Sequence, residues 1–186
     1  AARALRTIFR TALNRNRAYG NICSEAHYAA CRQIGDEGVV LLQNKNRILP
    51  LDANKYKHIL VVGENAIRSL TKGGGSSELK TKKDVTPLEA IRAMYGSNVD
   101  YAQGYLSGRA MYDHVDDVSI DDLARLSSEA VEKAKNADLI IYVGGMNKNT
   151  KQDCENSDRD DYNLSYGQNE LIAKLAKVCP NIIAVM

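Results

Sequence analysis

Residues 137–172 read ADLIIYVGGMNKNTKQDCENSDRDDYNLSYGQNELI. A short apolar run at 139–143 is followed by a long polar segment rich in carboxylates, and a helix-forming sequence from Gln168 then carries the chain back. Loops of more than about 12 to 15 residues without regular structure are uncommon in compact domains and are usually functional or disordered. We therefore expect any chemistry of this chain to lie in this segment.

The rest of the sequence alternates apolar strand-like runs with amphipathic helices. The sequence predicts strands at 58–63, 99–103, 139–143 and 182–185, and helical patterns fall at 86–95, 119–136 and 168–178. The clearest helix start is Thr86-Pro87-Leu88-Glu89, which combines an N-cap hydroxyl, a proline at the first helical position and a glutamate placed to complete a capping box. This alternation predicts an α/β fold with a mostly parallel sheet and helices on both faces, an α/β sandwich.

The first 50 residues differ from this pattern. Apolar residues at helical spacing predict a helix within residues 1–20, Ser24 is a candidate N-cap of a second helix with Glu25 in its first turn, and residues 39–43 are expected to be extended. The sequence opens inside a helical pattern and stops on the apolar run IIAVM. We therefore expect a fragment of a longer protein whose sandwich domain is truncated at its C-terminus.

Composition excludes several classes of function. The chain has 186 residues and a formal net charge of +2, which argues against nucleic acid or an anionic membrane as a partner. There is no apolar run of about 18 residues, so no membrane span is expected. The spacing of the cysteines predicts free thiols, and the three histidines show no metal or triad pattern, so we expect no metal site and no cofactor.

Two conspicuous loops should meet at one edge of the sheet. The glycine-rich stretch KGGGSS at 72–77 follows the strand at 58–63, and the carboxylate segment follows the strand at 139–143. Ligands of parallel sheets bind outside the carboxyl ends of the strands, so both loops could serve one ligand. The spacing of KGGGSS matches neither a P-loop nor a dinucleotide fingerprint. It remains open whether this stretch faces a ligand or another domain, connects flexibly, or binds phosphate.

The carboxylate segment contains the candidate acids Asp153, Glu155, Asp158, Asp160 and Asp161. A glutamate on such a loop can act as a general acid if another surface covers it and raises its pKa. The alternative is that these charges are simply solvated. One carboxylate also does not complete a glycosidase, which needs two carboxylates flanking the scissile bond.

Several segments, in order along the chain, resemble one known family. They are AARALRTIF at 1–9, AACRQIGDEGVVLLQNKNRILPL at 29–51, HILVVGENA at 58–66, GGGSS at 73–77, TPLEAI at 86–91, ADLIIYVGG at 137–145 and CENSDRDDYNLSYGQNELI at 154–172. The chain resembles the glycoside hydrolase family 3 β-glucosidases and their relatives, specifically the α/β-sandwich domain that follows their catalytic barrel. The resemblance implies that residues 1–50 are a linker and helices leaving the barrel, and that residues 51–186 are an incomplete sandwich domain.

The resemblance also implies roles for individual residues. The family's general acid/base glutamate falls on Glu155, and Asp153 is a near competitor for that role. Asn156 stands where the family usually has glycine, which affects the local loop conformation because a residue with a Cβ does not adopt positive φ as freely. The substrate-binding residues implied by the resemblance are Ser76, Ser77, Asp158 and Arg159. The family's nucleophile, an aspartate of the barrel, matches nothing in this chain.

The implied function is that of the second domain of a retaining, exo-acting β-glycosidase. Its partners would be a β-linked oligosaccharide or glycoside substrate and the barrel domain of the parent protein, and the resemblance favours a secreted or periplasmic location. One alternative is a non-catalytic domain that packs on the barrel or holds carbohydrate. Another is a nucleotide-binding doubly wound domain, which phosphate bound at residues 73–77 would support.

Overall fold

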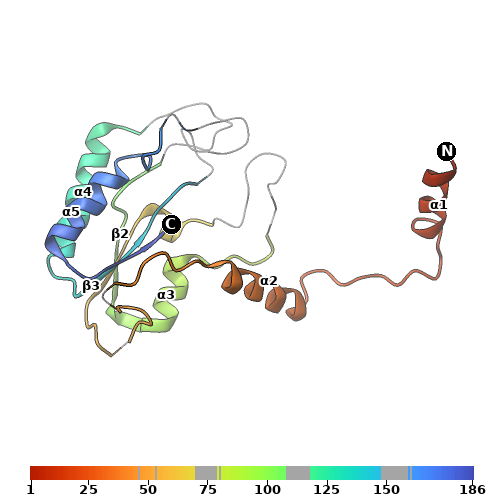
Figure 1. Ribbon diagram of the computed structural model, residues 1–186, viewed down its shortest axis with the longest axis horizontal. Coiled ribbons are helices and arrows are strands. Elements are labelled where there is room, and N and C mark those ends of the chain that lie inside the picture. The colour runs from red at the N-terminus through yellow and green to blue at the C-terminus, as the bar shows by residue number, and fades with distance from the viewer. Residues whose placement is uncertain are drawn as a thin grey trace. The chain divides into compact units, whose positions relative to one another are not determined.

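The computed structural model describes residues 1–45, 47–52, 54–69, 79, 81–107, 118–147, 159 and 161–186. The chain divides into two compact units, Ala1–Gln43 and Asn44–Met186. The helices and strands are labelled in Figure 1. No helix in the described ranges has the length and apolar character needed to cross a membrane.

The first unit contains two helices, α1 (Ala2–Arg10) and α2 (Glu25–Gly38). The predicted N-cap of α2 is confirmed: the Ser24 hydroxyl accepts a hydrogen bond from the His27 backbone N–H, and His27 Nδ1 accepts one from the Ser24 N–H. Neither helix has a buried residue. Residues 39–43 form no strand.

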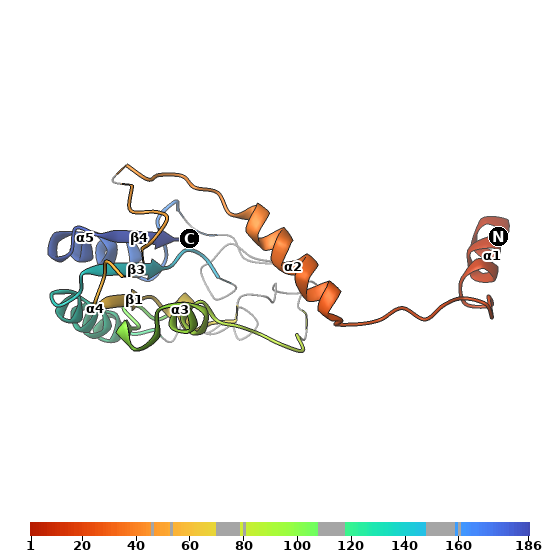
Figure 2. The same ribbon diagram turned by 90° about the horizontal axis from the view of Figure 1, so that it is seen from below.

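The second unit is built on a four-stranded sheet with the order β2-β1-β3-β4. Its strands are β1 (Ile59–Val62), β2 (Val99–Ala102), β3 (Leu139–Val143) and β4 (Ile182–Val185). Every neighbouring pair is parallel. Figure 2 shows β4, β3 and β1 in this order. Each strand falls within a predicted strand range, so the four predicted strands are confirmed.

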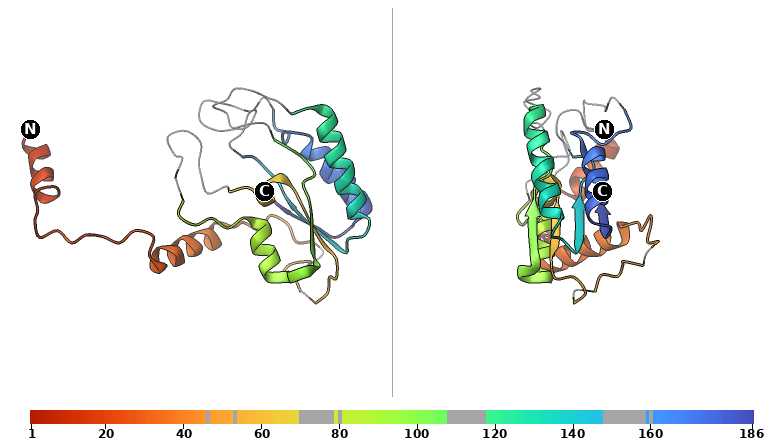
Figure 3. Two further views of the ribbon diagram at one scale, coloured as in Figure 1. Left: turned by 180° about the vertical axis from the view of Figure 1, so that it is seen from behind. Right: turned by 90° about the vertical axis from the view of Figure 1, so that its left-hand side faces the viewer.

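Helices cover both faces of the sheet. They are α3 (Pro87–Tyr95), α4 (Ile120–Ala134) and α5 (Gln168–Val178). Figures 1 and 3 show α4 and α5 side by side, with the strands between this pair and α3. The predicted α/β sandwich with a parallel sheet is therefore confirmed. Two short 3-10 helices, η1 (Glu64–Ile67) and η3 (Gly96–Asn98), were not predicted.

The alternation of side chains along the strands separates two hydrophobic layers. In β1, Leu60 and Val62 belong to the layer under α4 and α5, and Ile59 and Val61 belong to the layer under α3. All four residues of β1 and all five of β3 are buried. Burial of each large aliphatic side chain contributes about 1.5 to 3 kcal/mol, so these central strands form a rigid base for the loops that leave them.

Candidate functional site

The candidate site lies at the carboxyl edge of the sheet. Because the strands are parallel, their carboxyl ends meet at one edge, which is where ligands bind in this class of fold. The described residues that follow the strands there are 63–69, 103–107 and 144–147. The chain continues from them into 70–78, 108–117 and 148–158, which lie outside the described residues.

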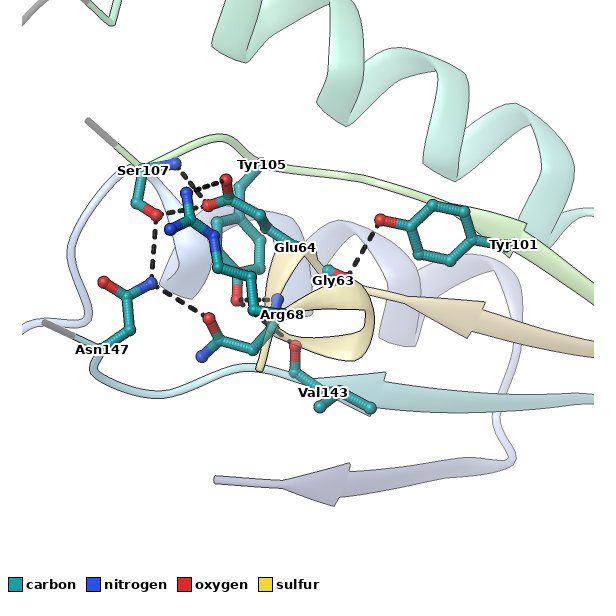
Figure 4. Close-up of polar contacts among 9 residues, drawn as sticks. Gly63, Glu64, Arg68, Tyr101, Tyr105, Ser107, Val143 and Asn147 are labelled. Carbon is teal, nitrogen blue, oxygen red and sulfur yellow. Dashed lines mark hydrogen bonds and ion pairs between the residues drawn. The ribbon is translucent and has the colours of Figure 1, made fainter. Parts of the chain in front are cut away.

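Glu64, the first residue of η1, is a buried carboxylate at this edge, with 3% of its surface exposed. Its Oε1 accepts a hydrogen bond of 2.7 Å from Arg68 Nη2, in an ion pair between residues four apart. Its Oε2 accepts from the Ser107 backbone N–H at 2.6 Å and from the Ser107 hydroxyl. Figure 4 shows these contacts. Both carboxylate oxygens are therefore engaged, and they tie the segment after β2 to the segment after β1.

Asn65 and Asn147 extend this network to the end of β3. Asn65 is fully buried, and its Nδ2 donates to the Gly144 carbonyl oxygen at 2.9 Å. Asn147 Nδ2 donates to Asn65 Oδ1 and to Ser107 Oγ, both at 3.0 Å. We call Glu64, Asn65, Ser107 and Asn147 the edge network. It connects the three segments that leave this edge, through Glu64 and Asn65 after β1, Ser107 after β2 and Asn147 after β3 (Figure 4).

Tyr105 links Asn65 of the edge network to the end of β3. Its hydroxyl donates to the Val143 carbonyl oxygen and accepts from the Asn65 backbone N–H, both at 3.3 Å. Burial raises the pKa of Tyr105. The phenol therefore stays protonated at neutral pH and keeps its role as a donor.

Tyr101 makes a similar contact at the end of β1. Its hydroxyl donates to the Gly63 carbonyl oxygen at 3.3 Å. Burial, together with the nearby charge of Glu64, raises the pKa of Tyr101 to about 12. This phenol too stays protonated at neutral pH, so both tyrosine hydroxyls can donate to backbone carbonyl oxygens.

Gln168 lies at the C-terminal end of the carboxylate segment. It is the first residue of α5 and only 1% exposed. Its Oε1 accepts from the Gly145 backbone N–H and from the Tyr142 hydroxyl, both at 3.0 Å, and its Nε2 donates to the Gly145 carbonyl oxygen at 3.1 Å. The residue at which the chain returns into α5 is thus bonded directly to the point at which the chain leaves β3.

Most of the site residues expected from the sequence lie outside the described residues. They are Ser76, Ser77, Asp153, Glu155 and Asp158. Arg159 is described, and its guanidinium carbon lies 5.2 Å from the centroid of the Tyr162 ring. This is a cation–π contact between residues close together in the chain, and it orients Arg159 locally.

The described residues form a support and not a complete catalytic centre. Glu64 is the only carboxylate among them that is buried, and its oxygens are already bonded. No buried side-chain nitrogen or oxygen in the described part lacks a hydrogen-bond partner. The same part contains no group of three or more His, Cys, Asp or Glu side chains able to hold a metal ion.

Neither the edge network nor the role of Gln168 was predicted from the sequence. One signal was available, because Glu64 and Asn65 follow the buried strand β1 by two and three residues, and Asn147 follows β3 by four residues. Polar residues in such positions face the edge where ligands bind. The pattern alone did not show that they bond to one another.

The sequence of this chain is similar to a known family model and to several known proteins. Residues 39–186 match the family model described as the glycosyl hydrolase family 3 C-terminal domain. The chain is 51% identical over 191 residues to the β-glucosidase BoGH3A of Bacteroides ovatus, covering 100% of this chain and 26% of that protein. It is 32% identical to a probable β-D-xylosidase 7 of Arabidopsis thaliana, covering 90% of this chain and 20% of the relative. An exo-α-(1→6)-L-arabinopyranosidase of Bifidobacterium longum is 31% identical, with 87% of this chain and 21% of the relative covered. The chain therefore spans only about a fifth to a quarter of the length of these relatives.

Solved structures give the same picture. The crystal structure of a Bifidobacterium adolescentis GH3 β-glucosidase superposes with a TM-score of 0.72 at 30% identity, over 97% of this chain and 24% of that chain. DesR, a β-glucosidase from Streptomyces venezuelae, superposes with a TM-score of 0.80 at 17% identity, over 97% of this chain and 35% of that chain. At that lower identity the second likeness supports the fold alone.

Proposed function

Because the chain belongs to the glycosyl hydrolase family 3 C-terminal domain family, we propose that it is the second domain of a retaining, exo-acting β-glycosidase of the β-glucosidase type. In this proposal residues 1–50 are the linker and helices that leave a barrel domain, and residues 51–186 are the sandwich domain. The barrel carries the nucleophile, and this chain supplies the general acid/base. The substrate is a β-linked oligosaccharide or glycoside.

Glu155 is the residue we assign as general acid/base. An aspartate of the barrel attacks the anomeric carbon while Glu155 protonates the leaving oxygen, and Glu155 then removes a proton from the water that hydrolyses the glycosyl-enzyme. In retaining enzymes the two carboxyl groups lie about 5 to 5.5 Å apart. The observation that carries the proposal is that the segment containing Glu155 begins at the carboxyl end of β3, where Gly144 and Gly145 are bonded to Asn65 and Gln168.

Four further residues are proposed on the substrate side. Ser76 and Ser77 follow β1 and help close the pocket, and Asp158 and Arg159 shape the segment around Glu155. The relatives include a β-glucosidase, a probable β-D-xylosidase and an arabinopyranosidase. Because related domains accompany such different sugars, we propose that sugar specificity is set largely by the barrel.

The test replaces Glu155 by Gln in the parent protein and compares leaving groups. Glu155→Gln should lower kcat/KM by about 10²-fold or more on substrates with poor leaving groups, because these need a proton. The loss should be much smaller on dinitrophenyl glycosides, which need little acid assistance. Azide should rescue Glu155→Ala and yield a glycosyl azide. Asp153→Asn is the matched control, and it should leave the dependence on the leaving group unchanged.

Two results would contradict the proposal. Equal losses on both substrate classes in Glu155→Gln would favour a domain that only packs on the barrel or holds carbohydrate. Appreciable turnover of an aryl β-glucoside by the 186-residue chain alone would show that the nucleophile does not lie in a separate barrel.

A further inference from the structure

We propose that Gln168 and Asn147 are positioning residues that fix the two ends of the carboxylate segment and so direct its general acid toward the leaving oxygen. This inference rests on the proposed function of Glu155. It assigns a role to side chains that do not touch substrate and that act through the backbone of residues 144–147.

Gln168 stands where the carboxylate segment ends, and its side-chain amide bonds to the backbone of Gly145, where the segment begins. Its side chain both accepts from the Gly145 N–H at 3.0 Å and donates to the Gly145 carbonyl at 3.1 Å. The Tyr142 hydroxyl donates to the same Oε1 at 3.0 Å. Since Gln168 is 1% exposed, water does not compete for these bonds. Removal of this side chain leaves the Tyr142 hydroxyl and the Gly145 N–H without this acceptor, and it leaves the Gly145 carbonyl with the longer bond of 3.5 Å from Asn65 Nδ2.

The backbone at this point allows little adjustment. A Cβ on Gly144 would lie 2.3 Å from the Tyr142 ring and 2.7 Å from Gln168 Oε1. Gly145 has φ of +87°, a conformation that residues with side chains rarely adopt. The path of the chain is therefore defined by close packing as well as by hydrogen bonds.

The edge network also bonds to the backbone of Gly144. Asn65 Nδ2 donates to Gly144 O, and Asn147 bonds to both Asn65 and Ser107 at 3.0 Å. Glu64 in turn accepts a hydrogen bond from the backbone N–H of Ser107, which fixes Ser107. Asn147 is the last described residue before the segment that contains Glu155. A displacement of about 1 Å at a catalytic group can reduce a rate by about 10²-fold, so the anchoring of this point should matter for acid catalysis.

The experiment uses the full parent protein and two variants, Gln168→Met and Asn147→Ala. Methionine keeps the approximate length of glutamine but makes none of its hydrogen bonds. The quantity measured is the ratio of kcat/KM on a disaccharide or alkyl glycoside to kcat/KM on a dinitrophenyl glycoside. We expect each variant to lower this ratio by about 10-fold or more, because acid assistance is lost while nucleophilic attack is kept. A variant that merely unfolds in part loses activity equally on both substrates and leaves the ratio unchanged.

Asn181→Ala is the matched control for Asn147→Ala. Asn181 is also partly buried, and its Nδ2 donates to the Asp138 carbonyl at 3.0 Å, at the amino end of the sheet. For Asn181→Ala, the ratio of the two kcat/KM values should stay within about two-fold of that of the unmodified protein. An unchanged ratio in both Gln168→Met and Asn147→Ala, or an equal fall in Asn181→Ala, would overturn the inference.

Glu155→Gln is measured in parallel so that the two proposals can fail separately. If Glu155→Gln lowers the ratio and the positioning variants do not, the inference is wrong and the proposed function stands. If Glu155→Gln itself leaves the ratio unchanged, the proposed function is wrong. Should Gln168→Met fail to fold, Asn147→Ala still decides the question, because its side chain is only partly buried.

Discussion

At the scale of single residues, Gly63 shows how closely β1 approaches β3 at the functional edge. Its φ is +134°, and a Cβ placed on it would lie 1.9 Å from the Val143 carbonyl oxygen. Its N–H donates to the Ala102 carbonyl at 3.1 Å. Glycine is therefore required here for two independent reasons, the backbone conformation and the lack of space. Because η1 and its Glu64 follow directly, the geometry of the edge network depends on this residue.

We expect Gly63→Ala to lower the free energy of unfolding by about 3 kcal/mol or more, because overpacking adds to backbone strain. Gly96→Ala is the control, since Gly96 has φ of +67° but no atom within 4 Å of the position that a Cβ would occupy. That variant should lose about 1 to 3 kcal/mol, the cost of a positive-φ backbone conformation without a steric clash. Urea-induced unfolding of the two variants measures the difference. Equal losses in the two variants would show that the contact with the Val143 carbonyl oxygen adds nothing to the cost of replacing Gly63.

At the scale of elements, the start of α3 is stabilised by contacts between residues three apart. The Thr86 hydroxyl accepts from the Glu89 N–H at 3.3 Å, and Glu89 Oε2 accepts from the Thr86 N–H at 2.8 Å and from the Thr86 hydroxyl at 3.0 Å. These bonds, the backbone N–H of Thr86 first, lower the pKa of Glu89. Since the depressed pKa reflects a bond made only in the folded state, the contribution is present above the ordinary glutamate pKa and is lost as the pH falls through the lowered value.

Glu89→Gln should therefore flatten the fall in stability of this chain between about pH 5 and pH 3. Thr86→Ala should in addition lower stability by about 1 kcal/mol at neutral pH, because the N-cap acceptor is lost. Thermal unfolding of both variants at several pH values checks this. If Glu89→Gln follows the same pH profile as the unmodified chain, the carboxylate is not bonded to the helix start in solution.

The same element shows why some features could be predicted from the sequence and others could not. The capping box of α3 joins residues three apart, so the sequence TPLE was sufficient to predict it. The edge network joins Glu64 to Ser107, 43 positions away, and Asn65 to Asn147, 82 positions away. Such pairs become visible only when strand order and register are known. The edge itself was predicted from strand direction, whereas the role of Glu155 stays a prediction that rests on family resemblance.

At the scale of the whole molecule, burial is distributed unevenly along the chain. Every residue of β1 and β3 is buried, whereas in β4 the first two residues are partly buried and the last two are exposed, and α1 and α2 have no buried residue. Isolated helices shorter than about 12 to 15 residues are only marginally stable in water, and α1 has nine residues. Local stability should therefore rise from the first unit toward the centre of the sheet.

Hydrogen exchange followed by mass spectrometry can measure this gradient directly. Amides of β1 and β3 should exchange slowest, because they open only with global unfolding, and amides of α1 should exchange at least about 10²-fold faster. Amides of β4 should fall between them, since among the described residues this strand pairs with β3 alone, and its side chains are more exposed. Protection of α1 equal to that of β3 would contradict this order. It would mean that the first unit gains its stability from contacts other than those within its own helices.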